Sequence, residues 1–97
     1  MSVMVLLEMQ VKPEAVEEVK ASLKTILPDT RSYAGCQGID IYSNLDNGGN
    51  LVFYERWDSR DHYQKYLNWR TETGVLSQLV AKLSGPPNIR YFDHVDA

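Results

Sequence analysis

Few residues of this chain have side chains suited to chemistry, and the first pair is His62 and Tyr66. Their spacing of four places both side chains on one face of a helix. A phenol and an imidazole so placed could hydrogen-bond a substrate hydroxyl, and the imidazole could accept its proton near neutral pH. We therefore take Tyr66 and His62 as candidate catalytic residues. The alternative is a partly exposed histidine beside a tyrosine of the core.

Aromatic residues are dense in the segments that alternate as strands do, and three of them are candidate substrate-binding residues. Trp57 could form a wall that stacks on an aromatic substrate. Tyr42 and Tyr91 could line the same cavity. Packing in the core explains Trp57 equally well, and packing across the sheet and at a dimer contact is the more frequent explanation for Tyr42 and Tyr91.

Other chemistries find no support in the residues. Two histidines, one cysteine and scattered carboxylates show no metal-ligand spacing, so no metal site is predicted. Nothing adjacent to Cys36 favours a reactive thiolate, and a buried structural thiol is expected. A phosphate-cradling glycine loop and a nucleophile elbow are both absent from the sequence.

Length and composition predict a single globular domain over residues 1–97. Hydrophobic residues make up 43% and charged residues 24% of the chain, and the net charge is −3. An acidic chain without a basic run is a poor binder of nucleic acid. A lone cysteine fits a reducing compartment, the N-terminus lacks a signal-peptide pattern, and Val3–Leu7 is too short to span a membrane. We expect a cytoplasmic protein without a membrane partner.

Periodicity places these candidates on predicted elements. Val3–Val11 alternates as a strand, and a helix is expected to begin at Pro13 and to stop at Pro28. Two strands are predicted next, over Cys36–Asn44 and Asn50–Asp58, joined by a turn at Asp46–Gly49. A helix capped by Ser59 and interrupted at Gly74 follows, and the last strand is expected over Ile89–Val95.

This order is β-α-β-β-α-β, which predicts an α+β, ferredoxin-like fold with a four-stranded antiparallel sheet and the helices on one face. Neighbouring apolar residues, as in Leu51–Tyr54, break the alternation expected of a sheet with one face in water. A second copy of the chain is the simplest cover for the second face. The sequence therefore predicts a homodimer through the open sheet face.

Three segments carry a resemblance to a known family. They are Phe53–Ser59 leading into an amphipathic helix, the first strand followed by Lys12–Glu14, and the loop Tyr33–Cys36. The chain resembles the antibiotic biosynthesis monooxygenase family over essentially its whole length. The resemblance implies a dimeric α/β barrel with a pocket between sheet and helices in each subunit. It also implies oxygenases without metal or flavin, in which an electron-rich phenol or quinol reacts with dioxygen itself.

Two departures narrow the expected function. Many members have a histidine where this chain has Tyr66, and the asparagine that haem-degrading members use in the first strand is missing. Haem degradation is therefore disfavoured. We expect a cofactor-independent monooxygenase that acts on a small phenolic or quinol-type substrate. The alternative is a non-catalytic small-molecule-binding or stress-related protein on the same dimeric scaffold, whereas the net charge disfavours an RNA-binding module.

Overall fold

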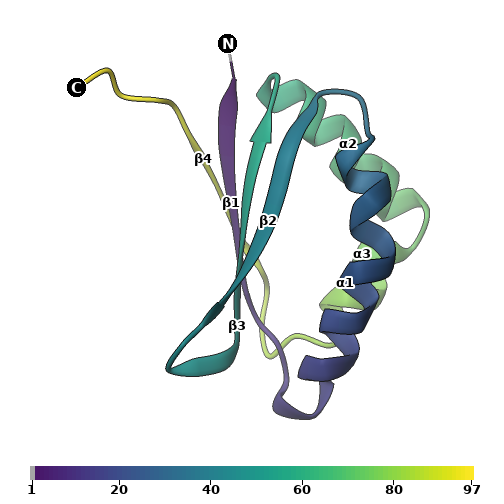
Figure 1. Cartoon of the computed structure of the whole chain (residues 1–97). Coiled ribbons are helices and arrows are strands. Elements are labelled where there is room, and N and C mark those ends of the chain that lie inside the picture. The colour runs from purple at the N-terminus through teal and green to yellow at the C-terminus, as the bar shows by residue number, and fades with distance from the viewer. Residues whose placement is uncertain (1) are drawn as a thin grey trace.

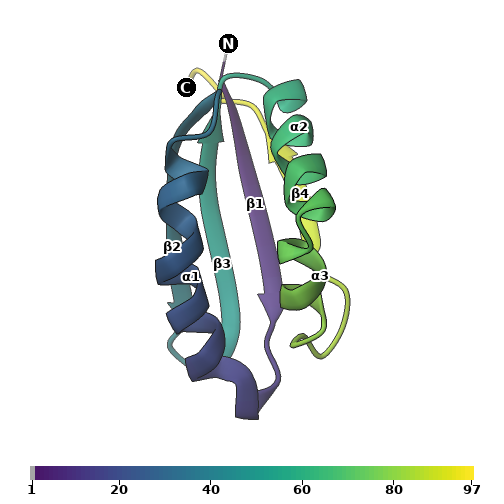
Figure 2. The same cartoon turned by 90° about the vertical axis from the view of Figure 1, so that its right-hand side faces the viewer.

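Within residues 2–97, which the computed structural model describes, three helices cover one side of a four-stranded antiparallel sheet (Figures 1 and 2). The strands lie in the order β2-β3-β1-β4. In chain order the elements are β1 (Val3–Gln10), a 3₁₀ turn (Pro13–Ala15), α1 (Val16–Arg31), β2 (Cys36–Asn44), β3 (Asn47–Trp57), α2 (Arg60–Glu72), α3 (Val75–Val80) and β4 (Asn88–Phe92). The predicted α+β, ferredoxin-like arrangement is confirmed.

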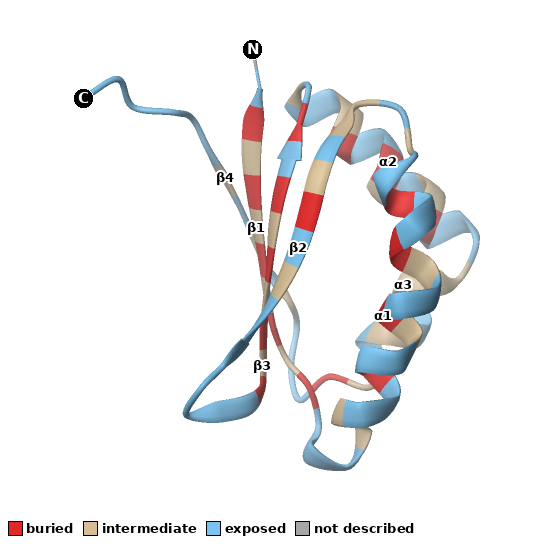
Figure 3. Ribbon diagram, in the orientation of Figure 1, coloured by how far each residue is buried: buried red, intermediate tan, exposed pale blue. Residues whose placement is uncertain are grey.

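The two central strands alternate strictly between the helix side and the open side of the sheet. In β1 the odd-numbered residues are buried under the helices, and the even-numbered ones are half-buried on the other face (Figure 3). The register pairs Leu7 with Phe53 and Val5 with Glu55. A carboxylic acid thus occupies a position that the alternation assigns to the core.

The turn between β2 and β3 lies earlier than predicted. It centres on Leu45 and Asp46, and the Asn44 side-chain oxygen accepts a hydrogen bond of 2.8 Å from the Asp46 N–H. Gly48 and Gly49 belong to β3, and neither has a positive φ. Gly49 is needed for another reason: a Cβ there would lie 2.7 Å from the Val11 carbonyl oxygen.

Helix α1 does not end at Pro28, as predicted, but continues to Arg31. The Ser32 N–H donates to the Pro28 carbonyl, which closes one further turn. Thr30 in that turn is fully buried, and its hydroxyl contacts α2. The last strand is also shorter than predicted and ends at Phe92, because Phe92 pairs with Met4 at the start of β1.

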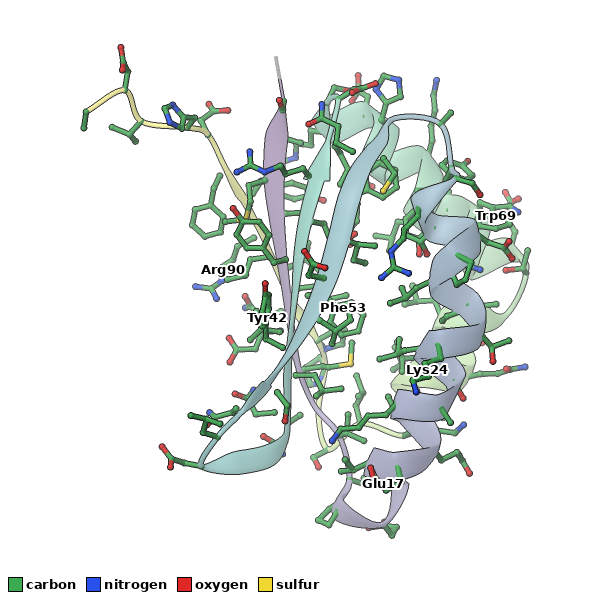
Figure 4. All side chains as sticks on the ribbon, in the orientation of Figure 1. Glu17, Lys24, Tyr42, Phe53, Trp69 and Arg90 are labelled. Carbon is green, nitrogen blue, oxygen red and sulfur yellow. The ribbon has the colours of Figure 1, made fainter. Side chains whose placement is uncertain are left out.

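The face of the sheet away from the helices has no cover within residues 2–97. Tyr42 is 59% exposed there, and Leu6 and Tyr54, which pair with each other across β1 and β3, are half-buried on the same face. Figure 4 shows Tyr42 and Arg90 on this side and Phe53 on the helix side. Arg90 forms a 3.4 Å ion pair with Glu8 on the open face, which is therefore mixed rather than wholly apolar.

The loop from α1 to β2 turns at Gly35, whose φ is +92°. A Cβ at this position would lie 2.5 Å from carbons of the His62 ring, at the start of α2. Only glycine satisfies both the backbone angle and the close approach.

Gly35→Ala is expected to lower the free energy of unfolding by at least about 1–3 kcal/mol, because a non-glycine residue at positive φ costs that much before any clash. Denaturant titration measures the loss. Gly38→Ala is the matched control, since nothing lies within 4 Å of a Cβ there and its φ is not positive. Equal stability of the two variants would contradict this account of the loop.

Candidate functional site

A small cavity lies between the sheet and the helices. Its volume is about 40 Å³. The walls are mostly apolar, with two ionisable groups of opposite charge, Glu55 and Arg70. The lining residues are Leu7, Leu23, Ile26, Leu27, Ile39, Phe53, Glu55, Tyr63, Tyr66, Leu67, Arg70, Val75, Leu76 and Leu79.

Glu55 is held in the cavity wall by the alternation of β3. It is 2% exposed and shares the inward face of the strand with Phe53 and Trp57. The indole N–H of Trp57 donates to Glu55 Oε1 over 3.1 Å, and no other side-chain hydrogen bond of Glu55 is found within residues 2–97. Burial raises the pKa of Glu55 from 4.5 to about 7, and the Trp57 hydrogen bond partly opposes the rise.

Arg70 is a buried cation held by neutral oxygens. Its Nε donates to the Tyr66 hydroxyl over 3.1 Å, and Nη2 donates to Thr30 Oγ1 at 2.9 Å and to the Ile26 carbonyl at 2.8 Å. The guanidinium also lies 4.5 Å from the centre of the Trp69 ring. No carboxylate pairs with Arg70 in the described part of the chain. The cavity therefore holds a positive charge without a counter-ion.

A second tyrosine, Tyr63, lines the cavity beside Glu55. It is 1% exposed, and its hydroxyl has no hydrogen-bond partner within residues 2–97. Burial, followed by the charge of Glu55, raises the pKa of Tyr63. Tyr63 is therefore a neutral hydrogen-bond donor at the cavity wall.

Two of the five predicted site residues belong to this region. Tyr66 lines the cavity, and its hydroxyl is 2.7 Å from Thr30 Oγ1. Trp57 is fully buried, with its ring centre 5.0 Å from that of Tyr66. Trp57 acts on the cavity through its hydrogen bond to Glu55 rather than as a lining residue.

The other three predicted site residues do not line the cavity, although the ring of Tyr91 packs 5.9 Å from that of Tyr63. His62 is at the start of α2, with its Nδ1 2.7 Å from the Ser59 hydroxyl, and is not hydrogen-bonded to Tyr66. Tyr91 lies on the edge strand β4, under the Arg60 guanidinium at 3.9 Å. Tyr42 points away from the helices (Figure 4), so it does not line the cavity between the sheet and the helices.

Sequence reasoning missed Glu55, Arg70 and Thr30 as site residues. A signal for Glu55 was present in the sequence: it is an odd-numbered residue of β3, like Phe53 and Trp57, and the odd-numbered residues of this strand face the core. Arg70 lies one helical turn after Tyr66, but nothing in the sequence shows that Thr30 would reach both of them from another helix.

Residues 2–97 contain neither a metal-binding cluster nor a membrane-spanning helix. No group of three or more His, Cys, Asp or Glu side chains there is arranged to hold a metal ion. In the same residues, no helix has the length and apolarity needed to cross a membrane.

The raised pKa of Glu55 makes stability depend on pH in a defined direction. Above pH 4.5 the unfolded chain loses the Glu55 proton while the native chain keeps it, so the native state loses stability up to about pH 7. Glu55→Gln removes this titration and keeps an acceptor for Trp57. The difference in unfolding free energy, variant minus wild type, is expected to increase by about 3 kcal/mol from below pH 4.5 to above pH 7.

Chemical denaturation across this pH range measures the difference. Glu72→Gln, at an exposed position of α2, controls for the loss of one carboxylate. A difference between Glu55→Gln and wild type that is independent of pH would show that Glu55 titrates normally.

Comparison with known proteins agrees with this architecture. The family model described as "Antibiotic biosynthesis monooxygenase" matches residues 2–71. "Putative monooxygenase Rv0793" of Mycobacterium tuberculosis is 37% identical over 71 residues, covering 67% of this chain and 69% of that protein. Its solved structure has a TM-score of 0.79 at 28% identity, covering 100% of this chain and 98% of the other. A crystal structure titled as an antibiotic biosynthesis monooxygenase has a TM-score of 0.88 at 21% identity, covering 97% and 99%, and supports the fold alone. The chain belongs to the antibiotic biosynthesis monooxygenase family.

Proposed function

We propose that this protein oxygenates a small phenolic or quinol-type substrate in the cavity between the sheet and the helices, with Glu55 as the base. One observation carries the proposal: a buried carboxyl group and a buried guanidinium without a counter-ion line the same apolar cavity. The family and the printed name of the Mycobacterium tuberculosis relative support the reaction class.

The reaction needs a substrate that gives electrons to dioxygen, and removal of a proton makes a quinol a better donor. Glu55 would take the hydroxyl proton, which a carboxylate with a pKa of about 7 can do near neutral pH. The Arg70 guanidinium would stabilise the resulting anion, because a charge in a dry cavity acts strongly. For a quinol the balance is one quinol and one dioxygen giving one hydroxyquinone and one water. The substrate supplies all the electrons.

The tyrosines of the cavity have distinct proposed roles. Tyr66 is fixed by Thr30 and Arg70, so we assign it to positioning the guanidinium and to a hydrogen bond with the substrate. Tyr63 has an unused hydroxyl and could donate to the substrate oxygen. His62 contacts Ser59 and Gly35 instead, and we assign the role of base to Glu55 in its place.

Oxygen uptake in the presence of a panel of hydroquinones and polyphenols tests the reaction. Glu55→Gln is expected to lower kcat/KM by roughly 10²–10⁴-fold, the usual contribution of a positioned base. In the wild type kcat/KM should rise with pH through about 7, as Glu55 loses its proton, and the variant should lack this rise. Glu72→Gln should match wild type.

Tyr66→Phe removes only a hydroxyl and is expected to slow turnover by about tenfold while the fold persists. If a quinol binds but no variant or wild-type protein consumes oxygen, the proposed reaction is wrong. The protein would then be a small-molecule-binding member of the same scaffold.

We also propose a homodimer through the open face of the sheet, where Tyr42 and Phe92 are exposed. An obligate interface of this kind buries more than about 2,000 Å² in total. Leu6→Glu, in the middle of that face, is expected to convert a dimer into a destabilised monomer in analytical ultracentrifugation. Glu14→Lys, an exposed charge change before α1, is the control. A stable wild-type monomer at micromolar concentration would refute this assembly.

A further inference from the structure

The cavity at Glu55 is too small for the substrate proposed above. Its volume of about 40 Å³ is far below the roughly 300–1,000 Å³ of typical small-molecule sites. An aromatic ring therefore requires a wall of the cavity to move. The lining residues that the cavity shares with a larger hollow outside the helices indicate which wall this is.

A second hollow, of about 220 Å³, opens between α1 and α3 on the outside of the helix layer. Figure 2 shows α1 and α3 along the two sides of the same face of the sheet, with β1 and β3 visible between them. Four side chains line both this outer groove and the inner cavity: Leu23 and Ile26 from α1, and Val75 and Leu79 from α3. These four residues are the common wall between solvent and the site.

Helix α3 is the side of this wall that is easiest to displace. It spans only Val75–Val80 and contains no buried residue, whereas α1 buries Leu23 and Leu27. Helices of one or two turns have little stability of their own. Gly74, with φ of +81°, joins α3 to α2, and this connection can change shape because glycine adopts backbone angles closed to other residues.

The far end of α3 is tethered. The Lys82 ammonium forms a 2.6 Å ion pair with Glu18 on α1. The backbone carbonyl of Lys82 accepts a hydrogen bond from the Lys12 N–H. Val11 and Leu83 form an isolated bridge beside it. Movement is therefore expected at the Gly74 end, next to Val75.

We propose that substrates reach Glu55 through the groove between α1 and α3, by outward displacement of α3, and that Ile26 and Leu79 limit the size of the ring that passes. This inference rests on the proposed use of the cavity as a substrate site. In this proposal α1 stays in place and α3 moves.

The route makes a kinetic prediction that binding alone can test. Leu79→Ala thins the common wall, so it should raise the association and dissociation rate constants of an aromatic probe together. Ser22→Phe fills the outer groove without lining the cavity, so it should lower both. We expect changes of about tenfold, within the range over which association rates vary among mutants of one site.

The probe is 1-naphthol, followed by its own fluorescence in a stopped-flow instrument under anaerobic conditions. Leu76→Ala is the matched control, because Leu76 is also a leucine of α3 but lines only the inner cavity. It should change affinity without the parallel rise of both rate constants. Thermal unfolding of each variant confirms that the fold persists.

The outcomes separate this inference from the proposed reaction. If the rate constants shift as described while no quinol is oxidised, the access route stands and the reaction is wrong. If quinols are oxidised but Leu79→Ala and Ser22→Phe both leave the rate constants unchanged, the reaction stands and the route is wrong. If Ser22→Phe weakens affinity without slowing both steps, the groove is part of the binding site rather than a passage, which also overturns the inference.

Discussion

The carboxyl group of Glu55 sits where a strand should place an apolar side chain, and the rest of the site follows from that position. Strand alternation leaves it only 2% exposed, so the group is stable when it is neutral, paired or in contact with something that enters the cavity. Trp57 satisfies one oxygen, and burial raises the pKa to about 7. Such a group exists in both protonation states near neutral pH. This is the property that a reversible proton acceptor needs.

The positive charge of Arg70 is held in place by hydrogen bonds from two helices. Arg70 is anchored by a hydroxyl of α2, a hydroxyl of α1 and a carbonyl of α1. Thr30 can take part only because α1 continues past Pro28 for one more turn. The guanidinium is thus satisfied in part by neutral oxygens, so its charge is not cancelled before a substrate anion arrives. Pairing it directly with Glu55 would have neutralised both groups and removed the proposed chemistry.

The fold could be predicted because hydrophobic periodicity and turn residues are local signals. These signals correctly predicted the order of the elements, the hairpin of β2 and β3, and the cap at Ser59. The turn was misplaced because Asn47-Gly48 is a strong local signal, and the close approach of Gly49 to Val11 is a tertiary constraint. The site was harder to predict. Tyr66 was found by helical spacing, but Tyr42 was assigned to the wrong face for this cavity, and contacts such as that between Thr30 and Tyr66, 36 residues apart, have no local signature.

We expect the buried carboxyl group of Glu55 to titrate near neutral pH in the same cavity as Arg70, which pairs with no carboxylate within residues 2–97. Carbon NMR of the protein labelled at the glutamate carboxyl carbons measures this directly, with Glu55→Gln used to assign the resonance. The account predicts a titration midpoint near pH 7 for Glu55. A midpoint near the ordinary glutamate value of about 4.3 would contradict it, because the carboxylate would then be solvated or paired and no longer a base matched to neutral pH.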